Sequence, residues 1–133
     1  MTGFEITLTC LALNIYKEGR GDTIRGQQAI ALVTLNRARE QKTDICEVVF
    51  QPSQFSWTIT DIHHGVLKAN AKPDRNSKDW IISMKVAKQS FTLYDFTNGA
   101  TFFHATYMNP KPSWVGSMNF HGRFGLHYFY KPK

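Results

Sequence analysis

The sequence predicts a single α+β domain over residues 1–133, mainly helical, with a small antiparallel β element near its C terminus. Three observations support this prediction. Apolar residues recur at helical spacing before residue 92 and are flanked by capping residues. From Gly99 onward, aromatic residues and threonines alternate imperfectly, as in short strands. With 133 residues, 42% of them hydrophobic, the chain can bury one core and is too short for two.

The first predicted helix covers residues 4–18 and ends at Gly19 or Gly21. It places Glu18, in the stretch YKEGRGD, at its C-terminal end. This is an unfavourable position for an anion, because the helix dipole is negative there and raises the pKa of a carboxyl group. Burial of Glu18 would favour the protonated acid further.

A second helix is predicted over residues 24–41, where either Asp22 or Thr23 can cap its first turn. Its middle, AIALVTL, is apolar on nearly every side, which is typical of a helix at the centre of a domain. A short third helix over residues 44–50 begins with Asp44 and Glu47 at capping-box spacing.

The remaining segments are less regular. PSQFSW predicts a loop, and residues 58–76 predict a long irregular segment. A helix then runs from a cap near Ser77 to about residue 92, with a packing stripe formed by Trp80, Met84, Ala87 and Phe91. GATFFHATYM and FGLHYFY predict two strands, joined by NPKPSWVGSMNFHGR.

The net charge and the cysteines indicate which partners and which cellular compartment to expect. A net charge of +6, spread through the chain, favours a polyanionic partner such as an anionic cell-wall polymer; no nucleic-acid-binding motif is present. No membrane span or convincing signal peptide is found, so we expect a protein made in the cytoplasm that reaches any outer target by another protein's export or by lysis. We also expect a monomer. Cys10 and Cys46 are predicted to be buried free thiols.

Most catalytic chemistries lack their motif in this sequence. The five histidines do not show zinc-protease spacing, no Cys-x-x-Cys or G-x-S-x-G is present, and GRGD follows a helix instead of a strand. We therefore expect neither a metal nor a cofactor. Carboxylate chemistry remains, because cleavage of a glycosidic bond needs an acid that keeps its proton near neutral pH, and Glu18 meets that requirement.

A second carboxylate would be needed by most glycosidases. Asp22 is nearest in sequence, but its position before the second helix favours N-capping. The sequence thus favours a single-glutamate mechanism, in which Glu18 protonates the leaving oxygen and its carboxylate then takes a proton from a substrate hydroxyl.

Five segments, in order along residues 8–130, resemble the motifs of the SleB-type cell wall hydrolases, the spore-cortex-lytic family whose catalytic domain also occurs in phage lysins. They are LALNIYKEGRGDTIRGQQAIALVTLNRAREQ, DICEVVFQPSQFSW, GATFFHA, PSW and GLHYFY. The resemblance implies a lysozyme-like, lytic-transglycosylase-like fold that cuts peptidoglycan between N-acetylmuramic acid and N-acetylglucosamine. It also implies that Glu18 is the catalytic acid/base.

The same resemblance suggests substrate-binding residues. It places in or beside the glycan groove Gln54, Phe55, Ser56, Trp57, His104, Trp114 and His127. Arg20 either pairs with Glu18, grips a peptide-stem carboxylate or lies on the surface. The family usually has alanine and glutamate where this chain has Gly19 and Asp22, and the missing targeting features favour a phage endolysin-like member. The alternatives are a hydrolytic muramidase with a second carboxylate, or a non-catalytic cationic module that binds cell wall or nucleic acid.

Overall fold

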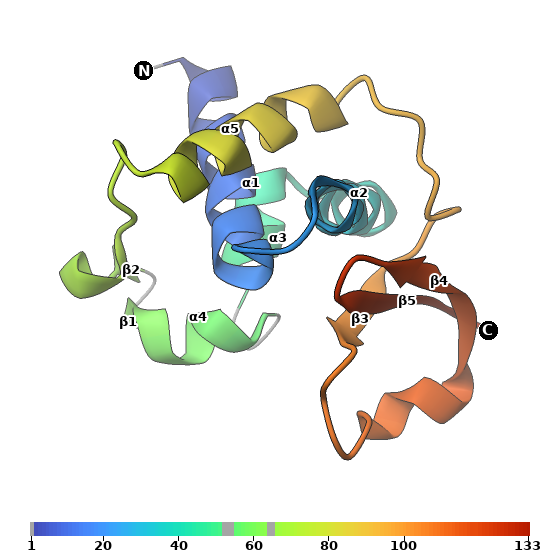
Figure 1. The fold of residues 1–133 in the computed structure, drawn as a ribbon. Coiled ribbons are helices and arrows are strands. Elements are labelled where there is room, and N and C mark those ends of the chain that lie inside the picture. The colour runs from blue at the N-terminus through green and yellow to red at the C-terminus, as the bar shows by residue number, and fades with distance from the viewer. Residues whose placement is uncertain (1, 52–54, 64–65) are drawn as a thin grey trace.

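The computed structural model describes residues 2–51, 55–63 and 66–133. Its elements in chain order are α1 (Gly3–Gly19), α2 (Ile24–Gln41), α3 (Ile45–Phe50), α4 (Ser56–Asp61), β1 (Ile62–His63), β2 (Val66–Leu67), η1 (Ala69–Ala71), α5 (Lys78–Ser90), β3 (Phe102–Ala105), η2 (Ser113–Ser117), β4 (Met118–Phe124) and β5 (His127–Pro132). Figure 1 shows α1, α2, α3 and α5 gathered in one helical body, with the β3–β5–β4 sheet at its lower right. The predicted mainly helical α+β class is confirmed.

The helix starts follow from their capping residues. Thr2 and Glu5 form a reciprocal capping box at the start of α1. At the start of α2 the Thr23 hydroxyl accepts a hydrogen bond from the Gly26 amide at 3.0 Å. Asp22 is therefore not the cap, which corrects the role that the sequence favoured for it.

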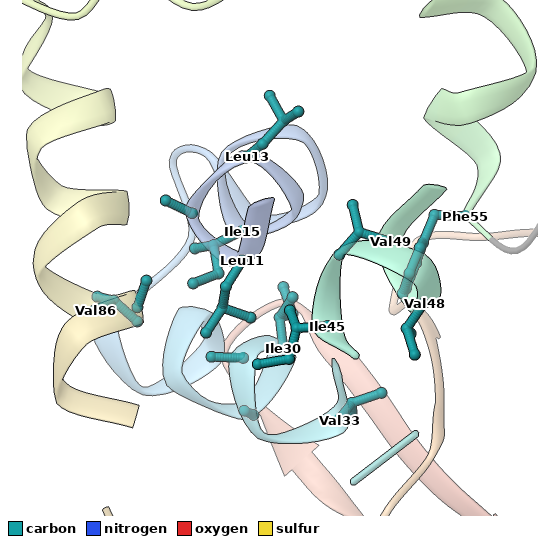
Figure 2. Close-up of a cluster of buried hydrophobic side chains, with 14 of the residues drawn as sticks. Leu11, Leu13, Ile15, Ile30, Val33, Ile45, Val48, Val49, Phe55 and Val86 are labelled. Atoms are coloured by element: carbon teal, nitrogen blue, oxygen red, sulfur yellow. The ribbon is translucent and has the colours of Figure 1, made fainter. Parts of the chain in front are cut away.

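The core is built around α1, whose Leu11 and Ile15 side chains are fully buried. Figure 2 shows these side chains among apolar residues from the other helices. The residues packed with them include Ile30 and Val33 of α2, Val48 and Val49 of α3, Val86 of α5 and Phe129 of β5. Because Phe129 belongs to the same cluster, the sheet is anchored to the helical body.

A disulfide joins Cys10 of α1 to Cys46 of α3, so the prediction of two free thiols is wrong. The packing of α3 on α1 brings the two Cα atoms to 5.3 Å, within the range that a disulfide spans. Helical periodicity places both residues on apolar faces but does not reveal that these faces meet.

The segment after Phe55 is more ordered than predicted. The expected loop and irregular stretch contain α4 and the antiparallel pair β1–β2. Phe55 stands at the N-cap of α4 without a side-chain hydrogen bond, so this six-residue helix lacks a start signal in the sequence. It is held instead by burial of Phe55 and Trp57 in the core cluster.

Helix α5 is capped by Ser77, as predicted. Trp80 and Ala87 are buried on its packing face, and Met84 is partly buried. Phe91 lies just beyond the helix end and is 40% exposed, which corrects its assignment to the packing stripe.

The sheet has the strand order β3-β5-β4 and is antiparallel throughout. The predicted pair corresponds to β3 and β5, in which His104 lies opposite Tyr128. The segment expected only to connect them forms η2 and the third strand β4. A register irregularity between Phe120 and Gly122 interrupts the alternation of β4, so its strand pattern is not visible in the sequence.

Among the described residues, no helix combines the length and the apolar character that a membrane span requires.

Candidate active site

A pocket of about 520 Å³ lies between the helical body and the sheet. Lys17, Glu18, Arg37 and Phe55 line it from the helical side. From β3, the segment that follows it and the start of β5, the lining residues are Phe103, His104, Ala105, Tyr107, Met108, Pro112, Trp114 and His127. The pocket thus joins charged groups from α1 and α2 to an aromatic wall.

Glu18 occupies the last turn of α1, where the sequence predicted it. Burial raises the pKa of its carboxyl group from 4.5 to about 7, although the positive charge of Arg37 acts to lower it. The next residue, Gly19, lets the end of α1 pack closely on α2, because a Cβ atom there would lie 2.9 Å from the Ile30 side chain. Because the pKa of Glu18 is about 7, both protonation states of its carboxyl group are accessible near neutral pH.

Arg37 is a functional candidate that the sequence did not identify. It is only 7% exposed, its Nε atom donates to the Thr101 carbonyl, and its guanidinium lies 4.8 Å from the centre of the Phe55 ring. Burial lowers the pKa of Arg37 to about 10, opposed by the charge of Glu18. Helix α2 carries Arg25, Arg37 and Arg39, and nothing in the sequence distinguishes the buried one from the other two.

His127 opens β5, lines the pocket and contacts Asp22. Its Nδ1 atom lies 2.9 Å from Asp22 Oδ2, and its side chain is 9% exposed. Asp22 does not line the pocket. The structure therefore brings Glu18 and His127 to one pocket and places Asp22 behind the histidine.

His104 and Trp114 also line the pocket. Both ring nitrogens of His104 are engaged, Nδ1 with the Ala105 carbonyl and Nε2 with the Tyr130 hydroxyl, each at 2.9 Å. Trp114, on η2, packs with its ring centroid 5.3 Å from that of Phe102. His104 thus stabilises the aromatic wall that Trp114 presents to the pocket.

Of the other described residues that the sequence suggested, Phe55 alone lines the pocket. Trp57 is in the core, where its Nε1–H donates to Asn14 at 2.8 Å. Arg20 is exposed and donates to the Tyr16 hydroxyl at 2.6 Å; it does not line the pocket. Ser56 is the first residue of α4, and Gln54 lies outside the described residues.

Glu18 is the one carboxyl group among the described residues that line the pocket. Within the described part of the chain, no group of three histidine, cysteine, aspartate or glutamate side chains is arranged to hold a metal ion. The described pocket wall offers one carboxyl group with a raised pKa, two cationic side chains and two imidazoles.

The mainly helical domain thus presents one buried carboxyl group of raised pKa beside an aromatic wall. The model of the cell wall hydrolase family matches residues 21–130, so the chain belongs to this family of enzymes, which act on peptidoglycan. The matched region begins after Glu18 and leaves the role of that residue untested.

The fold is similar to the crystal structure of the catalytic domain of the Bacillus cereus SleB protein. The TM-score is 0.72 at 21% sequence identity, and the similarity covers 96% of this chain and 91% of the other. No curated protein matches the sequence.

Proposed function

We propose that this protein cleaves the glycan strand of peptidoglycan between N-acetylmuramic acid and N-acetylglucosamine, as a lytic transglycosylase in which Glu18 is the catalytic acid/base. Membership of the cell wall hydrolase family supports the substrate class. The pKa of Glu18, raised to about 7 by burial in a pocket, supports the role of the acid most directly.

The first step uses the protonated form of Glu18. Its carboxyl group donates the proton to the glycosidic oxygen, and the bond between that oxygen and the anomeric carbon of the muramic acid breaks. The new carboxylate is then stabilised by the positive charge of Arg37, which acts strongly because the pocket is partly shielded from water.

The second step closes a ring within the substrate. The C6 hydroxyl of the same muramic acid attacks the anomeric carbon, and its proton returns to Glu18, so that an anhydro end forms and the enzyme is restored. This route needs no second carboxylate, which agrees with Glu18 being the one carboxyl group on the described pocket wall. In a hydrolytic muramidase, water would attack instead.

Glu18→Gln tests the proposal, since the amide keeps the shape of the side chain and cannot donate an acidic proton. We expect the wild type to release soluble fragments from purified peptidoglycan and Glu18→Gln to release none, with an unchanged circular dichroism spectrum. Glu40→Gln, at an exposed position on α2, is the matched control and should retain activity. Activity in Glu18→Gln would refute the role of Glu18.

Mass spectrometry of the fragments separates the two outcomes of the second step. Anhydro ends indicate transglycosylation, whereas reducing ends indicate hydrolysis and would favour the muramidase.

A further inference from the structure

The imidazole of His127 is held by a buried carboxylate. Asp22 Oδ2 lies 2.9 Å from His127 Nδ1, and Asp22 Oδ1 accepts backbone hydrogen bonds from Thr23 at 2.6 Å and Leu126 at 3.0 Å. An ionised carboxylate can only accept hydrogen bonds, so in its contact with Asp22 the His127 Nδ1 atom carries the hydrogen. In the neutral ring, Nε2 then has a free lone pair.

Close backbone approaches build this position of Asp22. The Asp22 side chain is 2% exposed, and a Cβ atom on Gly26 would lie 2.5 Å from Asp22 Oδ2. A Cβ on Gly125, which has a φ of 59°, would clash with Oδ1. Two glycines thus leave room for the carboxylate and fix it between the start of α2 and the turn before β5.

His127 lines the pocket, whereas Asp22, which holds its Nδ1 atom, does not. The ring nitrogen that Asp22 leaves free is Nε2. Nε2 has no hydrogen-bond partner among the described residues, whereas both nitrogens of His104 are engaged. Of these two pocket histidines, His127 alone keeps a basic nitrogen available to a ligand in the described structure.

We propose that His127 is a second catalytic residue, whose Nε2 accepts the proton of the hydroxyl that attacks the anomeric carbon, and that Asp22 is its positioning residue. This inference rests on the proposed glycan cleavage. After Glu18 has protonated the leaving oxygen, the attacking oxygen bonds to the anomeric carbon and its proton passes to Nε2. The imidazolium then gives that proton to the Glu18 carboxylate, so both residues return to their starting states.

The charges around the pocket agree with such a transient proton. Asp22 stabilises the imidazolium from behind. Lys17 and Arg37, which share the pocket, repel a lasting positive charge and favour transfer of the proton to Glu18. Lys17 is itself held by Asp61, at 2.9 Å, so its charge has a fixed place.

Two variants test this proton relay, in which the proton of the attacking hydroxyl passes through His127 to Glu18. For each variant, initial rates are measured on purified peptidoglycan. His127→Gln removes the proton acceptor, so we expect kcat to fall about 100-fold, the lower range for loss of a general base, with KM changed less than about threefold. His121→Gln is the matched control, because His121 bonds to the Thr97 carbonyl outside the pocket; it should keep wild-type kcat.

Asp22→Asn tests the positioning role. The amide of the new side chain donates to His127 Nδ1 while its oxygen still accepts from the backbone, so the hydrogen of the ring moves to Nε2. We expect nitrogen NMR to show this changed tautomer in a folded protein, together with a fall in kcat of at least about tenfold.

Wild-type kcat in folded His127→Gln, or in Asp22→Asn with the changed tautomer, would overturn the relay while leaving glycan cleavage by Glu18 intact. If His127→Gln does not fold, Asp22→Asn alone decides. If the wild type releases no fragments, the proposed function itself fails and the relay fails with it.

Discussion

The buried carboxyl group of Glu18 should make the protein less stable as the pH rises toward neutral. The pKa is 4.5 for an ordinary glutamate and about 7 in the folded chain, because burial disfavours the charged form. One pH unit of such a difference corresponds to about 1.4 kcal/mol, so the effect on the free energy of unfolding is up to about 3 kcal/mol.

The direction of this pH dependence follows from the protonation of Glu18 in the folded and unfolded states. Below pH 4.5 the carboxyl group is protonated in both, and its contribution to stability is fully present. Between pH 4.5 and about 7 the unfolded chain ionises first, which favours unfolding, and the contribution is lost by about pH 7. Glu18→Gln has no such group, so we expect it to be more stable than the wild type at neutral pH and to lose this advantage in acid.

Urea unfolding followed by circular dichroism measures the effect. The free energy of unfolding of Glu18→Gln, relative to wild type, should be about 3 kcal/mol higher at a pH near 8 than at a pH near 4. Exposed Glu40→Gln should show no such dependence on pH. An equal difference between Glu18→Gln and wild type at both pH values would refute the burial of Glu18 and, with it, the origin of its raised pKa.

Three further results are expected. Replacing Cys10 and Cys46 by serine opens a loop of 36 positions and should lower the free energy of unfolding by about 4 kcal/mol; calorimetry should show reductant lowering Tm in the wild type alone. Trp114→Ala removes part of the aromatic wall and should raise KM about tenfold, equivalent to about 1.4 kcal/mol, with kcat kept; an unchanged KM would exclude Trp114 from substrate binding. Arg37→Gln removes the charge that lowers the pKa of Glu18, so the alkaline limb of the pH–rate profile should move to higher pH; a shift to lower pH would contradict this coupling.

Local patterns in the sequence predicted what depends on neighbouring residues. The end of α1 at Gly19 placed Glu18 correctly, because a helix stop is encoded within a few positions. The caps at Asp44 and Ser77 were predicted for the same reason.

Local sequence patterns could not predict contacts between segments that lie far apart in the chain. Asp22 was assigned to the nearest helix start, yet its side chain bonds to His127, 105 positions away. No prediction was made for Arg37, yet its Nε donates to the Thr101 carbonyl, 64 positions away. In α4, tertiary burial of Phe55 decided the structure where local propensity gave no signal.

The pocket is assembled from segments that lie far apart in the chain. Glu18 is translated before the wall that faces it, which includes Trp114 and His127. A nascent chain therefore carries its acid before it has the surroundings that raise its pKa or hold a sugar. Catalytic competence should appear only after Phe129 has joined the core and β5 has completed the pocket.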